Sequence, residues 1–332
     1  MSILNGKKAF VTGADGFIGS HLVEALVSAG AAVRALVYYN SWNSIGWLSD
    51  VPQTVRRDVE IFAGDVRDSD RMRQGVAGCD YVFHLASLIG IPYSYEAPSS
   101  YVATNVVGTL NVLEACRQSG VVQRLIHTST SEVYGTAQTM PICESHPLVG
   151  QSPYSASKIA ADKLAESFFL SFGLPVVTAR PFNTFGPRQT ARAVIPTIAS
   201  QLLAGAKELK LGALTPTRDF NFVQDTVRGI IALSEADGVQ GAVMNIGSGE
   251  EFSIEQTARL LMQVTSRDVP IVCEAERMRP ANSEVNRLVA DAARLRRATG
   301  WTPTVGFAEG LHRTVDWIGR NLHHFKTDGY VR

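Results

Sequence analysis

The sequence has few cysteines, no excess of either charge and no long apolar run. Its four cysteines, at positions 79, 116, 143 and 273, have neither metal-ligand spacing nor the density of a disulfide framework, so we expect reduced thiols, no metal site and a cytoplasmic protein. The 31 basic and 31 acidic residues cancel, which argues against a surface for nucleic acid or a membrane. No apolar run is long enough to span a bilayer, and Met1 leads into the first expected strand without a signal peptide.

The chain is long enough, and at 45% apolar residues hydrophobic enough, to bury a full core. Short apolar runs typical of buried strands alternate with helical periodicity, as in the expected helices 101–117 and 154–172. This alternation predicts an α/β fold with a doubly wound parallel sheet, whose ligands bind at the carboxyl ends of the strands. The expected strands are Lys8–Thr12, Ala32–Tyr38, Val59–Ala63, Tyr81–Leu85, Arg124–Thr128 and Pro175–Arg180.

A glycine-rich turn follows the first expected strand. Gly13, Gly16 and Gly19 have the spacing Gly-x-x-Gly-x-x-Gly, and helical periodicity begins at Phe17. Between a strand and a helix, such glycines let the backbone approach a pyrophosphate, and the helix N-terminus offers free N–H groups to the phosphates. The sequence therefore predicts a dinucleotide site formed by Gly13, Asp15, Gly16, Phe17, Ile18 and Gly19.

Tyr154 and Lys158 lie four residues apart in an expected helix, so their side chains share one face. An ammonium group near the phenol favours the phenolate, and lowering the pKa of a tyrosine by about 3 units requires roughly 4 kcal/mol of differential stabilisation. A Tyr-x-x-x-Lys pair also occurs on ordinary exposed helices. Downstream of a dinucleotide site, however, the pair indicates redox chemistry with Tyr154 as the base.

The second half of the chain is less regular and has several segments rich in proline and glycine. We therefore expect a dinucleotide-binding domain over residues 1–182, with parts of 220–250 returning to it, and a smaller substrate-binding lobe mainly over residues 183–332. Arginines recur in this lobe, and their guanidinium groups suit the oxygens of a diphosphate. Any one of these arginines could equally be an ordinary surface residue. They are Arg188, Arg192, Arg218 and Arg279.

Taken together, these motifs resemble the extended short-chain dehydrogenase/reductases of the NAD-dependent epimerase/dehydratase family, which act on nucleotide sugars. The resemblance covers essentially the whole chain. It implies a Rossmann-type domain, a tightly held NAD(P) and a sugar that is oxidised and then reduced again in one site. It rests on Thr12–Gly19, Gly64–Val66, His84–Ala86, Asn105, Gly108–Thr109, Tyr154 with Lys158, Arg180–Asn183 and Arg218–Phe220.

The resemblance also implies roles for individual residues. Thr130 would hydrogen-bond a sugar hydroxyl beside Tyr154. The cofactor would contact the glycine turn, Asp65 and Val66 at the adenine, and also Leu85, Ala86, Asn105, Tyr154 and Lys158. The expected substrate contacts are Ser87, Tyr93, Asn183, Arg192, Arg218 and Arg279, although Tyr93 is equally placed to cover the pocket.

Glu132 distinguishes among the reactions of this family. A 4-keto group acidifies the hydrogen at C5, and Glu132 is placed to remove it, after which the C6 hydroxyl leaves and the hydride returns to C6 to give a 4-keto-6-deoxy sugar. The hexose 4,6-dehydratases that this chain resembles commonly carry Asp-Glu here, with Asp as the acid, whereas this chain has Ser131. Because a serine hydroxyl is a poor acid, either Glu132 shuttles the proton or Ser131 holds a water.

Two other reactions stay open. Ser131–Gly135 also resembles the motif of nucleotide-glucuronate decarboxylases, and a 4-epimerase needs only the ketone. The segments Tyr38–Leu48 and Ile89–Tyr95 are similar to those of nucleotide-N-acetylglucosamine 4,6-dehydratases of the legionaminic-acid type. We therefore predict 4,6-dehydration of UDP- or GDP-N-acetylglucosamine, with UDP favoured. Redox-sensing relatives usually lose the Tyr or the Lys, and both are present here.

The end of the second expected strand does not decide between NAD and NADP. An acidic residue there would mark NAD and a nearby arginine NADP, but Val37 and Tyr38 occupy the position, and Asn40 is a candidate to bind the ribose. The resemblance favours NAD and leaves NADP open. It also implies a homodimer that forms through the helices 101–117 and 154–172.

Overall fold

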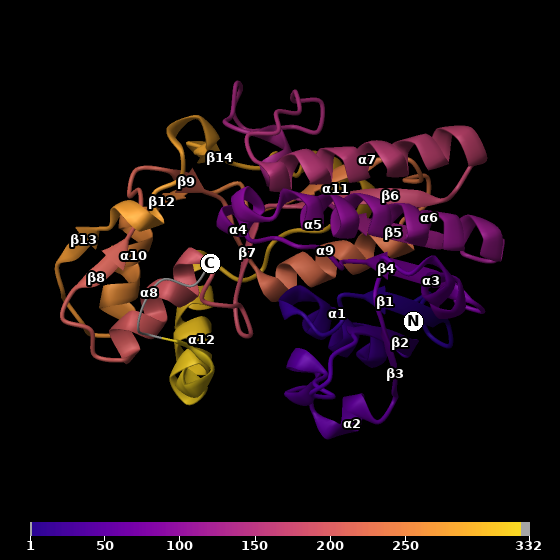
Figure 1. Ribbon diagram of the computed structural model, residues 1–332, viewed down its shortest axis with the longest axis horizontal. Helices are drawn as coiled ribbons and strands as arrows, with labels where there is room; N and C mark the ends of the chain where they lie inside the picture. The colour runs from indigo at the N-terminus through magenta and orange to yellow at the C-terminus, as the bar shows by residue number, and fades with distance from the viewer. Residues whose placement is uncertain (1, 327–332) are drawn as a thin grey trace.

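The computed structural model describes residues 2–326, and a seven-stranded parallel sheet with helices on both faces forms its larger part (Figure 1). The strand order is β11-β6-β5-β4-β1-β2-β3, and each neighbouring pair is parallel. The predicted α/β doubly wound fold is confirmed. The strands are β1 (Lys8–Thr12), β2 (Ala32–Tyr38), β3 (Val59–Gly64), β4 (Tyr81–His84), β5 (Arg124–Thr128), β6 (Val176–Pro181) and β11 (Val243–Ile246).

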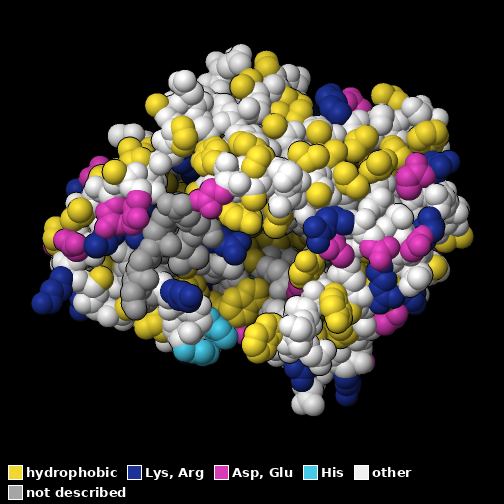
Figure 2. Space-filling model, viewed as in Figure 1, with side chains coloured by type: hydrophobic (Ala, Val, Ile, Leu, Met, Phe, Trp, Pro, Cys, Tyr) yellow, Lys and Arg dark blue, Asp and Glu magenta, His cyan; other side chains and the backbone are white. Residues whose placement is uncertain are grey.

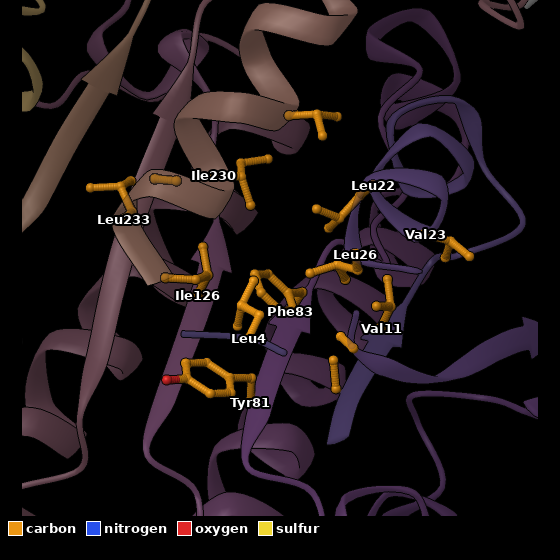
Figure 3. Close-up of a cluster of buried hydrophobic side chains, with 14 of the residues drawn as sticks. Leu4, Val11, Leu22, Val23, Leu26, Tyr81, Phe83, Ile126, Ile230 and Leu233 are labelled. Carbon is orange, nitrogen blue, oxygen red and sulfur yellow. The ribbon is translucent and has the colours of Figure 1, made fainter. Parts of the chain in front are cut away.

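Helices cover both faces of the sheet because successive strand residues point to opposite faces and both faces are apolar. One face packs against α1 (Phe17–Ser28), α9 (Val223–Glu235) and α11 (Ala293–Thr299). Figure 3 shows this core, where Val11, Phe83 and Ile126 of the strands meet Leu26 of α1 and Ile230 of α9. The preceding strand residues, Phe10, Val82 and Leu125, belong to the core on the other face, under α3 (Ser69–Val76), α6 (Gly108–Ser119) and α7 (Pro153–Phe172).

Two long helical segments lie on this second face. The expected helix 101–117 continues from α5 (Pro98–Tyr101) through a π-helical stretch (Val102–Val107) into α6. The helix α7 begins at a capping box of Ser152 and Ser155 with Pro153 in its first turn, and it ends at Gly173 with a φ of 66°. This N-terminal cap places Tyr154 in the first turn of α7, at the carboxyl edge of the sheet.

The smaller part of the molecule has its own core between α8 (Val194–Leu203), α10 (Ile254–Val264) and α12 (Phe307–Arg320). Ile198, Leu202, Leu261 and Leu311 are buried in it. Short strands complete this part: β7 (Asn183–Phe185) with β10 (Phe220–Phe222), β8 (Leu209–Leu211) with β13 (Ile271–Cys273), and β9 (Thr217–Arg218) between β12 (Phe252–Ser253) and β14 (Arg287–Leu288). The remaining short helices are α2 (Gln53–Arg56) and α4 (Ile91–Glu96).

The chain returns to the sheet twice after residue 183. First, α9 packs on the sheet and β11 pairs with β6 at its edge. Second, Leu295 of α11 and Trp301 join the core that contains Leu233. This second return was not predicted, since helical periodicity indicates an apolar face but not the core that the face joins. The division of the chain at residue 182 stays a prediction.

Across residues 2–326, no helix is both long and apolar enough to cross a membrane. In the same residues, no group of three His, Cys, Asp or Glu side chains is placed to hold a metal ion. All four cysteines are free thiols, of which Cys79 and Cys116 are buried and Cys273 is exposed.

Candidate active site

A cleft of about 800 Å³ opens at the carboxyl ends of the central strands and extends toward the smaller part of the molecule. Figure 2 shows the surface hollowed in this region. The walls come from the glycine turn, the ends of β2 and β3, residues 85–93, residues 128–132 and α7. All the predicted site residues line this cleft except Asn40, Asn105 and Arg218.

The glycine turn lies against the segment that follows β4. Gly13 has a φ of +68°, and a Cβ atom there would lie 2.8 Å from the backbone nitrogen of Ala86. A Cβ atom at Gly19 would lie 2.0 Å from the carbonyl oxygen of Gly13. Gly16 caps α1 without a side-chain acceptor, so the N–H groups of the first turn are open to an anion. The turn therefore suits the diphosphate of a dinucleotide.

Two carboxylates lie at the far end of the cleft, where the glycine turn meets β2 and β3. Asp15 accepts a hydrogen bond from the backbone nitrogen of Tyr38 at 3.0 Å, and burial raises the pKa of Asp15. Asp65 accepts from Nε of Arg67 at 2.9 Å, and this contact lowers the pKa of Asp65. Since Asp65 balances the charge of Arg67, little positive charge is available there for a 2′-phosphate.

Asn40 does not line the cleft, and its contact with the ribose stays a prediction. Its Nδ2 donates to the carbonyl oxygens of Tyr38 and Ser44, and its Oδ1 accepts from the backbone nitrogens of Trp42 and Ser44. These four bonds satisfy the amide and close its own loop. Local bonding of an asparagine to its loop therefore competes with ligand binding.

Asn105 does not line the cleft either, because it is only 1% exposed and lies behind the cleft wall; its contact with the cofactor stays a prediction. Its Oδ1 accepts from the backbone nitrogen of Leu88 at 2.8 Å and from Oγ of Ser87 at 2.9 Å. Its Nδ2 donates to the carbonyl oxygen of Leu88 and to Oγ of Ser157 on α7. Asn105 thus ties the wall that contains Ser87 and Leu88 to α7.

The predicted catalytic residues meet where β5 ends and α7 begins. A 3₁₀ turn (Ser131–Tyr134) follows β5 directly, and Oγ1 of Thr130 accepts from the backbone nitrogen of Glu132 at 3.2 Å. The hydroxyl of Thr130 is hydrogen-bonded to the phenol of Tyr154. Ser131 and Glu132 are 2% and 8% exposed, so this carboxylate is largely withdrawn from water.

Burial dominates the titration of the Tyr–Lys pair. It raises the pKa of Tyr154 above its ordinary value; the Thr130 hydrogen bond lowers it in part, and the charge of Glu132 raises it further. Nζ of Lys158 donates to the carbonyl oxygen of Thr128 at 2.8 Å, and burial lowers the pKa of Lys158 to about 8. The expectation that Lys158 lowers the pKa of Tyr154 toward neutrality is therefore not met in the protein alone.

A second pocket of about 230 Å³ adjoins the cleft and shares Asn183, Arg192 and Arg279 with it. Arg218 lines this pocket rather than the cleft, and its contact with the substrate stays a prediction. Nη2 of Arg218 lies 3.4 Å from Oε1 of Glu284, and Nη1 of Arg279 lies 3.5 Å from the same oxygen. The two guanidinium groups therefore converge on one carboxylate, in a pocket that suits an anionic group of a ligand.

Two amide oxygens of this region are buried without a hydrogen-bond partner in the part of the chain that the structure describes. They are Oδ1 of Asn183 and Oε1 of Gln189, and both residues line the cleft and the adjoining pocket. Because a buried acceptor is costly to leave unpaired, these oxygens fit a ligand that donates hydrogen bonds.

Sequence reasoning missed Glu284 and Gln189. Glu284 follows Arg279 by five residues, and that proximity of opposite charges was its only local signal. Gln189 lies in the irregular segment before α8, where no periodicity indicates which side chains face a pocket.

Known proteins resemble this chain over almost its whole length. The family model described as GDP-mannose 4,6 dehydratase matches residues 10–314. A dTDP-glucose 4,6-dehydratase of Streptomyces griseus is 34% identical over 318 residues, which cover 94% of each chain. Relatives named for other reactions also match, among them a UDP-glucuronic acid decarboxylase of Xenopus tropicalis.

Solved structures agree with these relatives. DesIV, a dTDP-glucose 4,6-dehydratase from Streptomyces venezuelae solved with NAD bound, superimposes with a TM-score of 0.86 at 31% identity and covers 96% of this chain and 99% of its own. A UDP-glucuronic acid 4-epimerase from Bacillus cereus, in complex with UDP-glucuronic acid and NAD, has a TM-score of 0.86 at 28% identity and covers 95% and 99%. With the glycine turn and the Tyr154–Lys158 pair in one cleft, these matches show that the chain is an enzyme of the NAD-dependent epimerase/dehydratase family of extended short-chain dehydrogenase/reductases.

Proposed function

We propose that this enzyme is an NAD-dependent nucleotide-sugar 4,6-dehydratase. The observation that carries the proposal is the position of Glu132, a nearly buried carboxylate in the same cleft as Tyr154 and close enough to influence its titration. A 4-epimerase requires no base at C5, whereas a dehydratase does. The dehydratase relatives support the same reaction.

The cleft fits NAD. Gly13 has no side chain and lies close to Ala86, and the N-terminus of α1 is open; both features suit the diphosphate of NAD. The ion pair of Arg67 with Asp65 favours NAD over NADP. When bound, NAD supplies a hydride acceptor for C4 of the sugar and returns the hydride to C6. Gly13, Gly16, Asp65, Val66, Leu85 and Lys158 are the residues that would hold it.

Tyr154 acts as the base that removes the proton of the C4 hydroxyl. Thr130 orients the phenol oxygen of Tyr154 and the C4 hydroxyl oxygen of the sugar through its hydrogen bond to the phenol. Because burial raises the pKa of Tyr154, the filled site must favour the phenolate, and the Lys158 ammonium on the same face of α7 contributes to this. Glu132 then removes the C5 proton of the ketone. Glu132 itself, or a water held by Ser131, protonates the departing C6 hydroxyl.

For the substrate we propose UDP- or GDP-N-acetylglucosamine, with the UDP sugar preferred. Arg192 and Arg279, and Arg218 in the adjoining pocket, would bind the diphosphate. Ile89, Pro92 and Tyr93 form an apolar stretch of the cleft wall, which suits the methyl of an acetamido group.

The proposal is tested by incubating the protein with NAD and, in separate reactions, with UDP-N-acetylglucosamine, GDP-N-acetylglucosamine, dTDP-glucose and UDP-glucuronic acid. Mass spectrometry should detect the loss of one water from UDP-N-acetylglucosamine. Water loss from dTDP-glucose alone would support the proposed dehydration but show that the substrate is dTDP-glucose. A 4-epimer of unchanged mass, or loss of carbon dioxide from the uronic acid, would reject the dehydratase.

Replacing Tyr154 by Phe should slow the oxidation step by about 10²- to 10⁴-fold, since the variant lacks the base for the C4 hydroxyl. Sugar-dependent reduction of NAD in a single turnover, followed by absorbance, measures this step. Tyr39→Phe is the matched control, because Tyr39 is 72% exposed and does not line the cleft. Near-normal reduction in the Tyr154→Phe protein would remove Tyr154 from the mechanism.

Replacing Glu132 by Gln should abolish water loss but preserve sugar-dependent reduction of NAD, because C4 oxidation does not need the C5 base. We expect dehydration to fall by at least about 10²-fold. Measuring cofactor reduction and product mass on the same sample separates the two steps. Full dehydration by Glu132→Gln would show that another group removes the C5 proton.

We further propose a homodimer formed through α5, α6 and α7. Figure 2 shows apolar side chains gathered over this part of the molecule, and Val102, Leu170 and Phe172 are 51%, 74% and 56% exposed. Light scattering at micromolar concentration should give twice the chain mass of 35.9 kDa, and Leu170→Glu should shift the protein toward monomer. A monomeric native protein would contradict the proposal.

A further inference from the structure

A cluster of buried polar side chains adjoins Lys158 outside the cleft. Asp162 follows Lys158 by one turn on the same face of α7 and is 4% exposed. Its Oδ2 accepts from Nε and Nη2 of Arg180 on β6, at 3.0 and 2.9 Å. Its Oδ1 lies 3.1 Å from Nε2 of His127 on β5. Asp162, Arg180 and His127 do not line the cleft.

The two histidines near this cluster are neutral. The hydroxyl of Thr109 donates to the carbonyl oxygen of Asn105 at 2.6 Å, so it must accept from Nε2 of His84, and Nδ1 of His84 then accepts from the hydroxyl of Thr12. Burial lowers the pKa of both His84 and His127, and the charge of Lys158 lowers both further. The Nε2 proton of His127 therefore goes to Asp162.

Tyr134 and Ser129 are further polar neighbours of the cluster, and both are uncharged. Nη1 of Arg180 donates to the phenol of Tyr134 at 3.0 Å, and burial raises the pKa of Tyr134 to about 12. On the cleft side, Lys158 shares its wall with the neutral phenol of Tyr154 and with Glu132. Within this cluster of residues 2–326, the buried charges are thus the anion Asp162 and the cation Arg180, and Glu144 lies beyond Tyr134.

Asp162 acts on Lys158 directly, whereas Arg180 acts through its pairing with Asp162. Asp162 attracts the ammonium, but its carboxylate already accepts from Nε and Nη2 of Arg180, and this pairing weakens the attraction. Lys158 itself has the carbonyl oxygen of Thr128 as its hydrogen-bond acceptor, which is a dipole and not a full charge. Its charged form is therefore incompletely compensated.

We propose that Asp162 and Arg180 are positioning residues that together set the charge state of Lys158, with Asp162 favouring the ammonium and Arg180 limiting that effect by pairing with the Asp162 carboxylate. The pKa of Lys158 agrees with this arrangement, because burial lowers it to about 8 and Asp162 opposes the lowering. The inference rests on the proposed role of Lys158 in the cleft. It does not depend on which sugar reacts.

The test measures Lys158 in the protein without cofactor, by urea unfolding over a range of pH. The native protein and each variant are compared with a counterpart, which is the same protein carrying Lys158→Met. The difference in the free energy of unfolding then reports the titration of Lys158. The pKa of Lys158 is about 8 in the fold and has an ordinary value of 10.5, so between these values the unfolded chain binds more protons. The free energy of unfolding, relative to the counterpart, should therefore rise with pH from about 8 and level off near 10.5.

The two variants should move the onset of this rise in opposite directions. Asp162→Asn keeps a hydrogen-bonding side chain but removes the attraction, so the onset should fall by about 1 pH unit or more, a tenfold change in the proton-dissociation constant. Arg180→Gln frees the Asp162 carboxylate to act on the ammonium, so the onset should rise. Glu166→Gln, at an exposed position on the same helix, is the matched control and should leave the onset unchanged.

Unchanged onsets in both variants, or shifts in the same direction, would overturn the proposal, because loss of packing alone has no reason to give opposite signs. If Asp162→Asn does not fold, since it leaves Arg180 unpaired in the core, the double variant with Arg180→Gln removes both charges. Comparing that double variant with Arg180→Gln alone then isolates the charge of Asp162, and its onset should be the lower of the two. Failure of dehydration would leave this measurement intact, so the two proposals fail separately.

Discussion

The close contact between the glycine turn after β1 and the segment after β4 is the constraint on which the rest of the site depends. Oγ1 of Thr12 accepts from the backbone nitrogens of Leu85 and Ala86, and Gly13 leaves no room for a side chain against Ala86. This contact fixes one wall of the cleft against the N-terminus of α1. Asn105 then ties the same wall to α7, and so to Tyr154.

Burial determines the chemistry that this cleft can support. It raises the pKa of Tyr154 and lowers that of Lys158, so in the protein alone burial disfavours the charged form of each residue. Fixed groups then decide how far each shift goes. Thr130 and Glu132 act on the tyrosine from the cleft side, while Asp162 acts on the lysine from behind.

Local patterns predicted those parts of the fold and site that depend on neighbours along the chain. The predicted strands lie within one residue of β1 to β6, because apolar runs, turn glycines and helix caps are short-range signals. The glycine turn was found for the same reason. Local patterns did not indicate that Asn40, Asn105 and Arg218 lie outside the cleft, since packing decides the partners of a polar side chain.

The sequence by itself determined the fold class, the dinucleotide turn and the face of α7 that carries Tyr154 and Lys158, because backbone conformation and periodicity follow from residue type and spacing. The tertiary structure decided which distant charges meet. Glu284 joins Arg218 and Arg279, and Asp162 joins Arg180 and His127, across separations that no local pattern encodes. It also decided how deeply each group is buried, and burial, more than residue type, controls where Tyr154 and Lys158 titrate.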